Sequence, residues 1–139
     1  MGDSQDALLS EFVSTNPSSE EDVLAAEKAF GVTLPQDYRS FLLGRGGGEG
    51  FLGEQYLILW NADQIVPYNA DYEAETYAPG LLIFGSSGGG EGFAFDLRKQ
   101  CNDIVAVPFI GMSLKDAKSI APSFTDFLEK LSQPDAELF

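Results

Sequence analysis

The chain has 139 residues, of which 22 are Asp or Glu and 8 are Lys or Arg, so its formal net charge is −14. A hydrophobic fraction of 44% with 12% aromatic residues excludes a disordered chain and, at this length, predicts one compact domain over residues 1–139. Because the chain contains no histidine, Ser-His-Asp triads, Cys-His dyads and histidine metal sites are excluded within it.

The N-terminal part of the sequence predicts two helices. Apolar residues at helical spacing predict the first over residues 3–15, which Asn16-Pro17 ends. The second is expected to begin at Ser18, where Glu21 completes a capping box, and to end at Gly31 as its C-terminal cap.

The middle of the chain predicts a third helix, a strand covered on both faces, a short helical turn and a segment that could be either a helix or a loop. Pro35 stands where the third helix would begin. Its core face is expected to comprise Tyr38, Phe41 and Leu42. Residues 56–60 leave almost no polar position, which is typical of a strand covered on both faces. Asn61 is expected to cap a short helical turn that Pro67 limits, and residues 71–77 form either a short helix or a loop.

The second half predicts strands and then a closing helix. Three strands are expected over residues 81–84, 93–97 and 104–110. Pro108 suits the end of the last strand, Pro122 opens the helix, and residues 132–139 are expected to form a loose tail. Helices followed by strands and one helix favour an α+β domain with a mainly antiparallel sheet.

The sequence GGGEGF occurs twice, at residues 46–51 and 88–93. Residues 48–53 match G-x-G-x-x-G, but a helix is expected before them and a strand after them, which is the reverse of a dinucleotide-binding turn. The second copy lacks the Lys-Ser or Lys-Thr of a phosphate-binding loop, and each copy carries an acid, Glu49 or Glu91. We therefore interpret both copies as turns, and not as nucleotide sites or a duplicated module.

Acidic residues are distributed unevenly along the chain. Seven precede Lys28, the first basic residue, and the 52 residues between Arg45 and Arg98 hold eight acids and no base. This distribution disfavours direct binding to nucleic acid or anionic membranes and favours attraction of a basic partner. The alternative is that the acids only keep the protein soluble. No apolar run approaches the roughly 20 residues of a membrane span, and the first residues lack the basic character of a secretory signal.

Few residues are candidates for catalysis or cofactor binding. Asp71, Glu73 and Glu75 could in principle supply a pair of catalytic carboxylates, but acids this close in a polar segment usually form a solvated face. They also lack the spacing of an EF-hand. Cys101, the single cysteine, follows two basic residues that could activate its thiol, although a small turn residue is the commoner role. We therefore assign no catalytic residue, cofactor or metal ligand, and we expect a reducing, cytoplasmic location.

Several motifs occur in one order along the chain. They are AEKAFGVTLPQDYRSFLLGRGG, YLILWNADQI, LLIFGSSGGGEGFAFDL, IVAVPF and APSFTDFLEKL. The most characteristic positions are Glu27, Gly31, Leu34, Pro35, Tyr38 and Phe41, followed by the glycines at 46–48 and by a strand, glycine turn and strand that close on Asp96. With these motifs the sequence resembles the SMI1/KNR4 family, also called the SUKH superfamily, over about residues 18–131.

The resemblance implies an α+β fold, with helices packed on a curved, mainly antiparallel sheet, and no catalytic motif. Bacterial members of the family are immunity proteins that bind and neutralise a cognate toxin, often a nuclease. Fungal members regulate cell-wall synthesis and signalling and usually carry long disordered flanks. Since this sequence has no such flanks, the resemblance favours the bacterial type. A regulatory or scaffold module that binds an endogenous protein is the alternative, and a small enzyme ranks third.

The family supplies no partner-contacting residues by motif, so the candidates come from charge. A nuclease has a basic cleft, which an acidic surface could occupy in place of nucleic acid. The candidates are Asp71, Glu73 and Glu75, with Tyr72 and Tyr77 as neighbouring aromatic anchors and with Glu49 and Glu91 as lesser members. We expect a basic cognate toxin as the partner, no direct contact with nucleic acid or membrane, and a chain that is a monomer or a homodimer.

Overall fold

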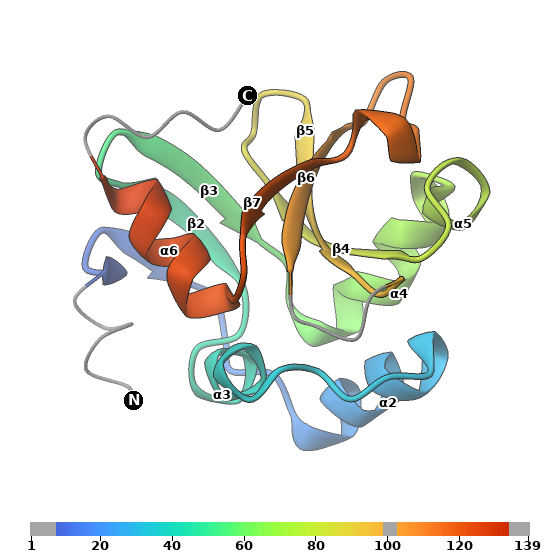
Figure 1. The fold of residues 1–139 in the computed structure, drawn as a ribbon. Helices are drawn as coiled ribbons and strands as arrows, with labels where there is room; N and C mark the ends of the chain where they lie inside the picture. Colours follow the sequence, from blue (N-terminus) through green and yellow to red (C-terminus); the bar gives the residue numbers. More distant parts are fainter. Residues whose placement is uncertain (1–7, 99–102, 134–139) are drawn as a thin grey trace.

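The chain folds into an antiparallel sheet surrounded by helices (Figure 1). The computed structural model describes residues 8–98 and 103–133. Within these residues seven strands follow one another through the sheet in chain order, each antiparallel to the next. The strands are β1 (Phe12–Ser14), β2 (Gly48–Leu52), β3 (Gln55–Leu59), β4 (Leu81–Ser86), β5 (Glu91–Asp96), β6 (Ile104–Pro108) and β7 (Lys118–Ala121). The helices are α2 (Glu20–Phe30), α3 (Gln36–Gly44), α4 (Ala62–Asp71), α5 (Ala74–Tyr77), α6 (Phe124–Ser132) and the short 3-10 helix η1 (Leu114–Asp116). The predicted α+β class with an antiparallel sheet is confirmed.

The helices occupy different regions around the sheet. In Figure 1, α6 crosses the front face of the sheet, and it contacts β2, β7 and α3. Helices α2 and α3 lie below the sheet, and α4 and α5 lie at its right-hand end beside β4. Because α4 also contacts α2, segments that are far apart in the sequence meet at this end of the molecule.

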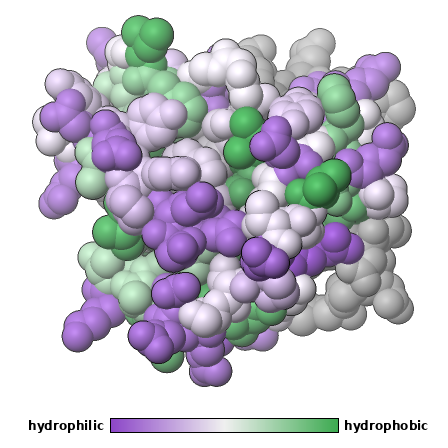
Figure 2. Space-filling model, turned by 180° about the vertical axis from the view of Figure 1, so that it is seen from behind, coloured by the Kyte–Doolittle hydropathy of each residue, from purple (hydrophilic) through white to green (hydrophobic). Residues whose placement is uncertain are grey.

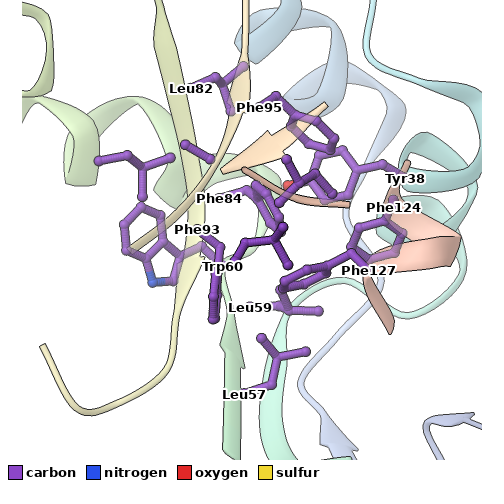
Figure 3. Packing of buried hydrophobic residues seen from close by; sticks show 14 of the residues in the cluster. Tyr38, Leu57, Leu59, Trp60, Leu82, Phe84, Phe93, Phe95, Phe124 and Phe127 are labelled. Carbon is purple, nitrogen blue, oxygen red and sulfur yellow. The ribbon is translucent and has the colours of Figure 1, made fainter. Parts of the chain in front are cut away.

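An aromatic cluster fills the space between the sheet, α3 and α6 (Figure 3). The ring centroid of Tyr38 lies 5.0 Å from that of Phe95 and 5.0 Å from that of Phe124. Phe84 from β4 and Phe127 from α6 pack against each other in the same cluster. These five side chains are at most 2% exposed. The structure also confirms the predicted core face of the third helix, which comprises Tyr38, Phe41 and Leu42.

The hydroxyl group of Tyr38 is buried in this cluster and has no hydrogen-bond partner within the described residues. Burying a hydroxyl without a partner costs about 1–3 kcal/mol. We therefore expect Tyr38→Phe, which removes only this hydroxyl, to raise the free energy of unfolding by about 1 kcal/mol in urea denaturation. Burial also raises the pKa of Tyr38 from its ordinary value of 10.0. Since the tyrosine of the unfolded chain ionises at a lower pH than that of the folded chain, its ionisation does not affect the free energy of unfolding below about pH 10 and lowers it as the pH rises further.

The phenylalanine variant should lose less stability above about pH 10 than the wild type, because it lacks the ionising group. Denaturation series at neutral and alkaline pH would measure both effects. A variant that is less stable than the wild type at neutral pH, or that shows the same alkaline loss, would contradict this account of Tyr38.

The N-terminal part of the structure differs from the prediction. The chain forms strand β1 close to the end of the predicted helix over residues 3–15, so the helix prediction is wrong there; residues 3–7 lie outside the described part. Phe12 is buried and stands opposite Gly50 in the register with β2. Apolar residues in a short segment suit either element, and the pairing partner, which is distant in the sequence, decides for a strand here.

Helix α2 begins one residue later than predicted. The hydroxyl of Ser19, and not that of Ser18, accepts a hydrogen bond from the N–H of Asp22 at 3.1 Å. The Ser18 hydroxyl instead accepts from the N–H of Ala62 at 3.1 Å, which attaches this loop to the start of α4. The predicted C-terminal cap, Gly31, is confirmed by its left-handed φ of 69°.

Helix α4 is longer than the predicted helical turn. Asn61 is its N-cap as predicted, but the helix continues through Pro67 to Asp71, so the prediction that Pro67 limits it is wrong. Pro67 deprives the carbonyl of Asp63 of its helical donor. Both residues lie on the exposed side of α4, where water can hydrate that carbonyl. Residues 71–77, for which the sequence allowed either a short helix or a loop, contain the short helix α5.

The two copies of GGGEGF fold differently. Residues 88–90 form the turn between β4 and β5, with φ values of 81° and 105° at the first and last glycine, which confirms the turn prediction for this copy. In the first copy, Gly46 and Gly47 lie in the connection between α3 and β2, with a φ of 78° at Gly46, whereas residues 48–51 belong to β2, so the turn prediction is wrong for those four residues. In both copies the central glycine of EGF permits a close approach. A Cβ at Gly50 would overlap the backbone of β1, and a Cβ at Gly92 would lie 2.7 Å from the ring of Phe109.

The C-terminal elements follow the prediction with two additions, the short helix η1 and strand β7. Pro108 ends β6, and the helix predicted from Pro122 is α6 with Ser123 as its N-cap. Strand β7, which precedes this helix, was not predicted from its short polar sequence. Cys101 and the predicted tail beyond residue 133 lie outside the described residues.

Candidate partner-binding site

Helix α4 is attached to the sheet by Asn69, which is only 7% exposed. The register between β3 and β4 covers two residue pairs, and the chain then leaves the sheet and enters α4. The Asn69 amide takes the place of the missing strand: its Oδ1 accepts the N–H of Ile83 at 3.0 Å, and its Nδ2 donates to the Ile83 carbonyl at 2.8 Å. Nδ2 also donates to the carbonyl of Ile65, at 2.7 Å. These bonds fix the orientation of α4 against β4.

The chain reverses direction between α4 and α5 at Glu73. This residue has a φ of 55° and a ψ of 41°, and it is the one described residue other than glycine with a positive φ. Ala74 and Ala78 are buried and hold α5 against the fold. Asp71, Glu73 and Glu75 are exposed around them. The structure therefore places all three predicted carboxylates of this segment at the surface.

A groove of about 610 Å³ opens between α4, α5, the end of α2 and the start of β4. Its apolar walls include Phe30 and Val32 from the α2 side, Val66 and Ala70 from α4, and Leu81 and Leu97 from β4 and the end of β5. Two predicted site residues, Glu73 and Glu75, line the same groove. The predicted acidic segment therefore lies beside an apolar recess that has room for a partner's side chains.

The two predicted aromatic anchors have different environments. The ring of Tyr72 is nearly parallel to that of Phe109, at a centroid distance of 4.1 Å, and to that of Trp60, at 6.2 Å. Internal stacking therefore fixes the ring of Tyr72, although 41% of this residue is exposed. Tyr77 is 53% exposed.

Figure 2 shows the back of the molecule, where hydrophobic residues lie in small groups between hydrophilic ones.

The two lesser candidates lie elsewhere and do not line the groove. Glu49 is on the exposed side of β2, where it accepts a hydrogen bond from the Tyr56 hydroxyl, and this bond raises the pKa of Tyr56. Glu91 begins β5 and accepts from the hydroxyl of Ser87 at 3.1 Å. The predicted residues thus divide into a segment at residues 71–77 and two carboxylates with partners of their own.

Charged residues of the quoted motifs stabilise the fold. The carboxylate of Glu27 accepts the N–H of Leu34 at 2.8 Å and lies 3.4 Å from the Nε of Arg39. Asp96 is 1% exposed and receives two hydrogen bonds from the guanidinium group of Arg98, each at 2.9 Å. The hydrogen bond from Arg98 to Asp96 raises the pKa of the arginine. Two of the few basic side chains, Arg39 and Arg98, therefore form ion pairs with carboxylates of the same chain.

Other kinds of site have no counterpart in the part of the chain that the structure describes. Residues 8–98 and 103–133 contain no group of three or more Cys, Asp or Glu side chains arranged to hold a metal ion. Among the same residues, no helix has the length and apolar character needed to cross a bilayer.

Sequence reasoning missed the apolar walls of the groove. Phe30, Val66 and Leu97 come from three separate segments, and each fits the ordinary pattern of a helix or a strand end. The contacts of α4 with α2 and with β4 bring these segments together. The nearest signal in the sequence was the acidic run at residues 71–77, which marks one side of the groove.

Two comparisons found similarity between this chain and known proteins. The "Uncharacterized protein YnaB" of Bacillus subtilis (strain 168) is 27% identical to this chain over 118 residues, which cover 84% of the chain and 77% of that relative. The model of the SMI1 / KNR4 family (SUKH-1) matches residues 17–130, which include every described strand and helix from α2 to β7. On this match, the chain belongs to the SMI1 / KNR4 family (SUKH-1).

Proposed function

We propose that this chain is an immunity protein, which binds a cognate bacterial toxin in the cytoplasm and neutralises it by forming a stoichiometric complex. The family to which the chain belongs includes immunity proteins. The observation that carries the proposal is the surface at residues 71–77, where three exposed carboxylates lie beside an apolar groove in a stretch of 52 residues without Lys or Arg.

This surface would act through long-range attraction and short-range contact. Its negative field accelerates encounters with a positively charged partner, by roughly 10- to 1,000-fold for steered association. Once the partner is close, the apolar walls of the groove bury its side chains and slow its dissociation. A nuclease toxin presents a basic cleft to its substrate, so the acidic segment can cover that cleft in place of nucleic acid. Such a mechanism makes and breaks no covalent bond.

Co-expression with the product of the adjacent gene tests the proposal. We expect the chain to relieve growth arrest caused by that product and to co-purify with it as a complex of the two proteins. A toxin from an unrelated gene pair serves as the specificity control and should remain toxic. A neighbouring product that is harmless, or that remains toxic and fails to co-purify, would contradict the proposal and favour a regulatory or scaffold module that binds an endogenous protein.

A further inference from the structure

We propose that the groove between α2, α4 and α5 binds an amphipathic helix whose apolar stripe is flanked by Lys or Arg residues. The inference rests on the proposed function only for the source of that helix, which is the partner toxin. The type of segment that binds is inferred from the walls, the charges and the backbone hydrogen bonds of the groove.

The dimensions and the walls of the groove fit an apolar stripe. Its volume of about 610 Å³ is comparable to the roughly 300–1,000 Å³ of small-molecule pockets, which is room for a few apolar side chains of a partner. Ala29, Ala70 and Ala74 line it from three helices, α2, α4 and α5, and leave room between the larger side chains of Phe30 and Val66. Small residues beside large ones create the recesses into which the apolar side chains of a partner can insert.

The charges around the groove select a basic partner. Within residues 8–98 and 103–133, Glu73 and Glu75 are its charged lining residues, and neither a Lys nor an Arg lines it. Two described bases are close to it in the chain: Lys28, which precedes the lining residue Ala29 in α2, and Arg98, whose aliphatic chain packs against Gly80 in the groove wall. The guanidinium group of Arg98 is held by both carboxylate oxygens of Asp96. The acids on the rim therefore remain available to Lys or Arg of a partner.

The backbone around the groove favours a helix over an added strand. Strand addition requires free N–H and C=O groups along a sheet edge. At β4 the two backbone groups of Ile83 are bonded to Asn69, and the N–H of Leu81 donates to the carbonyl of Ala78 at 3.2 Å. A partner must therefore bind through its side chains, as a helix does when its apolar face lies in a groove.

The test uses calorimetric titration of the full chain with two helical peptides. Both carry leucine at i, i+3, i+4 and i+7; one has arginines beside this stripe, and the other has glutamates at the same positions. We expect the arginine peptide to bind and the glutamate peptide to bind at least about tenfold more weakly. The variant E73Q/E75Q should weaken binding of the arginine peptide by at least about tenfold. Ala70→Lys, which places a long cation in the groove, should abolish binding.

A matched control separates the groove from net charge. Glu54 and Glu129 are exposed and lie outside the groove, so E54Q/E129Q removes the same charge and should leave the affinity unchanged. Circular dichroism and thermal unfolding of every variant verify that the fold is intact. Equal affinity for the two peptides, or an equal effect of the two double substitutions, would overturn the inference.

The same variants are titrated with the product of the adjacent gene. If that product binds the wild-type chain and the groove variants lose affinity, the inference is supported. If it binds all variants equally, the toxin-binding function survives and the groove inference fails. If it does not bind the wild-type chain, the proposed function fails, and the peptide titrations alone decide the inference about the groove.

Discussion

The substitution Asn69→Leu is expected to lower the free energy of unfolding by about 3 kcal/mol. Leucine has the same number of side-chain heavy atoms and the same branching, so the loss comes from hydrogen bonds and not from a cavity. The Asn69 amide satisfies both the N–H and the C=O of Ile83 where β3 has left the sheet. Without it, two buried backbone groups lose their partner, and each such loss costs about 1–3 kcal/mol. Urea denaturation measures the change.

A neighbouring position supplies the control for Asn69→Leu. Ala70 is exposed on the same helix, so Ala70→Ser should change the free energy of unfolding by no more than about 0.5 kcal/mol. If the leucine variant proved as stable as the wild type, the assignment of Asn69 as the connection between α4 and β4 would be wrong.

The second large effect is expected from replacing Asp71, Glu73 and Glu75 together by serine, which should weaken partner binding by about 100-fold or more. All three side chains are exposed, so the free energy of unfolding should change little. Asp71 ends α4, where a negative charge interacts unfavourably with the helix dipole. Replacing Asp71 therefore offsets part of any loss of stability caused by the other two substitutions. Surface plasmon resonance with the product of the adjacent gene measures the affinity.

Salt and position provide the controls for this triple variant. The affinity of the wild-type chain should fall as ionic strength rises, and that of the variant should fall less steeply. Serine at Glu11, Glu54 and Glu129 removes the same charge from exposed positions that do not line the groove and should have a much smaller effect. Affinity that responds neither to the triple substitution at residues 71–77 nor to salt would exclude an electrostatic mechanism.

Local sequence patterns were sufficient to predict those elements in which the spacing of the residues agrees with their burial in the folded chain. Tyr38, Phe41 and Leu42 have helical spacing, and α3 places all three in the core. Gly31 follows an apolar helical stripe, and it ends α2 in the left-handed conformation that glycine adopts readily. For these elements, local propensity and tertiary packing favour the same structure.

Other elements depend on contacts that a local pattern does not contain. Strand β1 exists because Phe12 and its neighbours pair with β2, more than thirty residues away in the register. Helix α4 continues past Pro67, and its Asn69 side chain is hydrogen-bonded to Ile83, 14 residues further along the chain. In both cases the stabilising partner belongs to a distant segment, so sequence spacing alone predicted the wrong element or the wrong length.

The candidate site shows the same division between local and distant information. The exposed acids at residues 71–77 were visible as a run of charge without bases. The apolar groove beside them was not, because Phe30, Ala70 and Leu97 meet only in the folded chain. Tyr72 was predicted as a partner-binding anchor, and that role stays a prediction, but its stacking on Phe109 could not have been inferred from the sequence.

The most direct test of toxin neutralisation is an activity titration. Purified product of the adjacent gene is assayed on its own substrate while increasing amounts of the chain are added. A stoichiometric inhibitor should lower the activity in proportion to its concentration and abolish it at an equimolar ratio. Activity that persists at a large molar excess of the chain, or that disappears at a small fraction of an equivalent, would contradict neutralisation by complex formation.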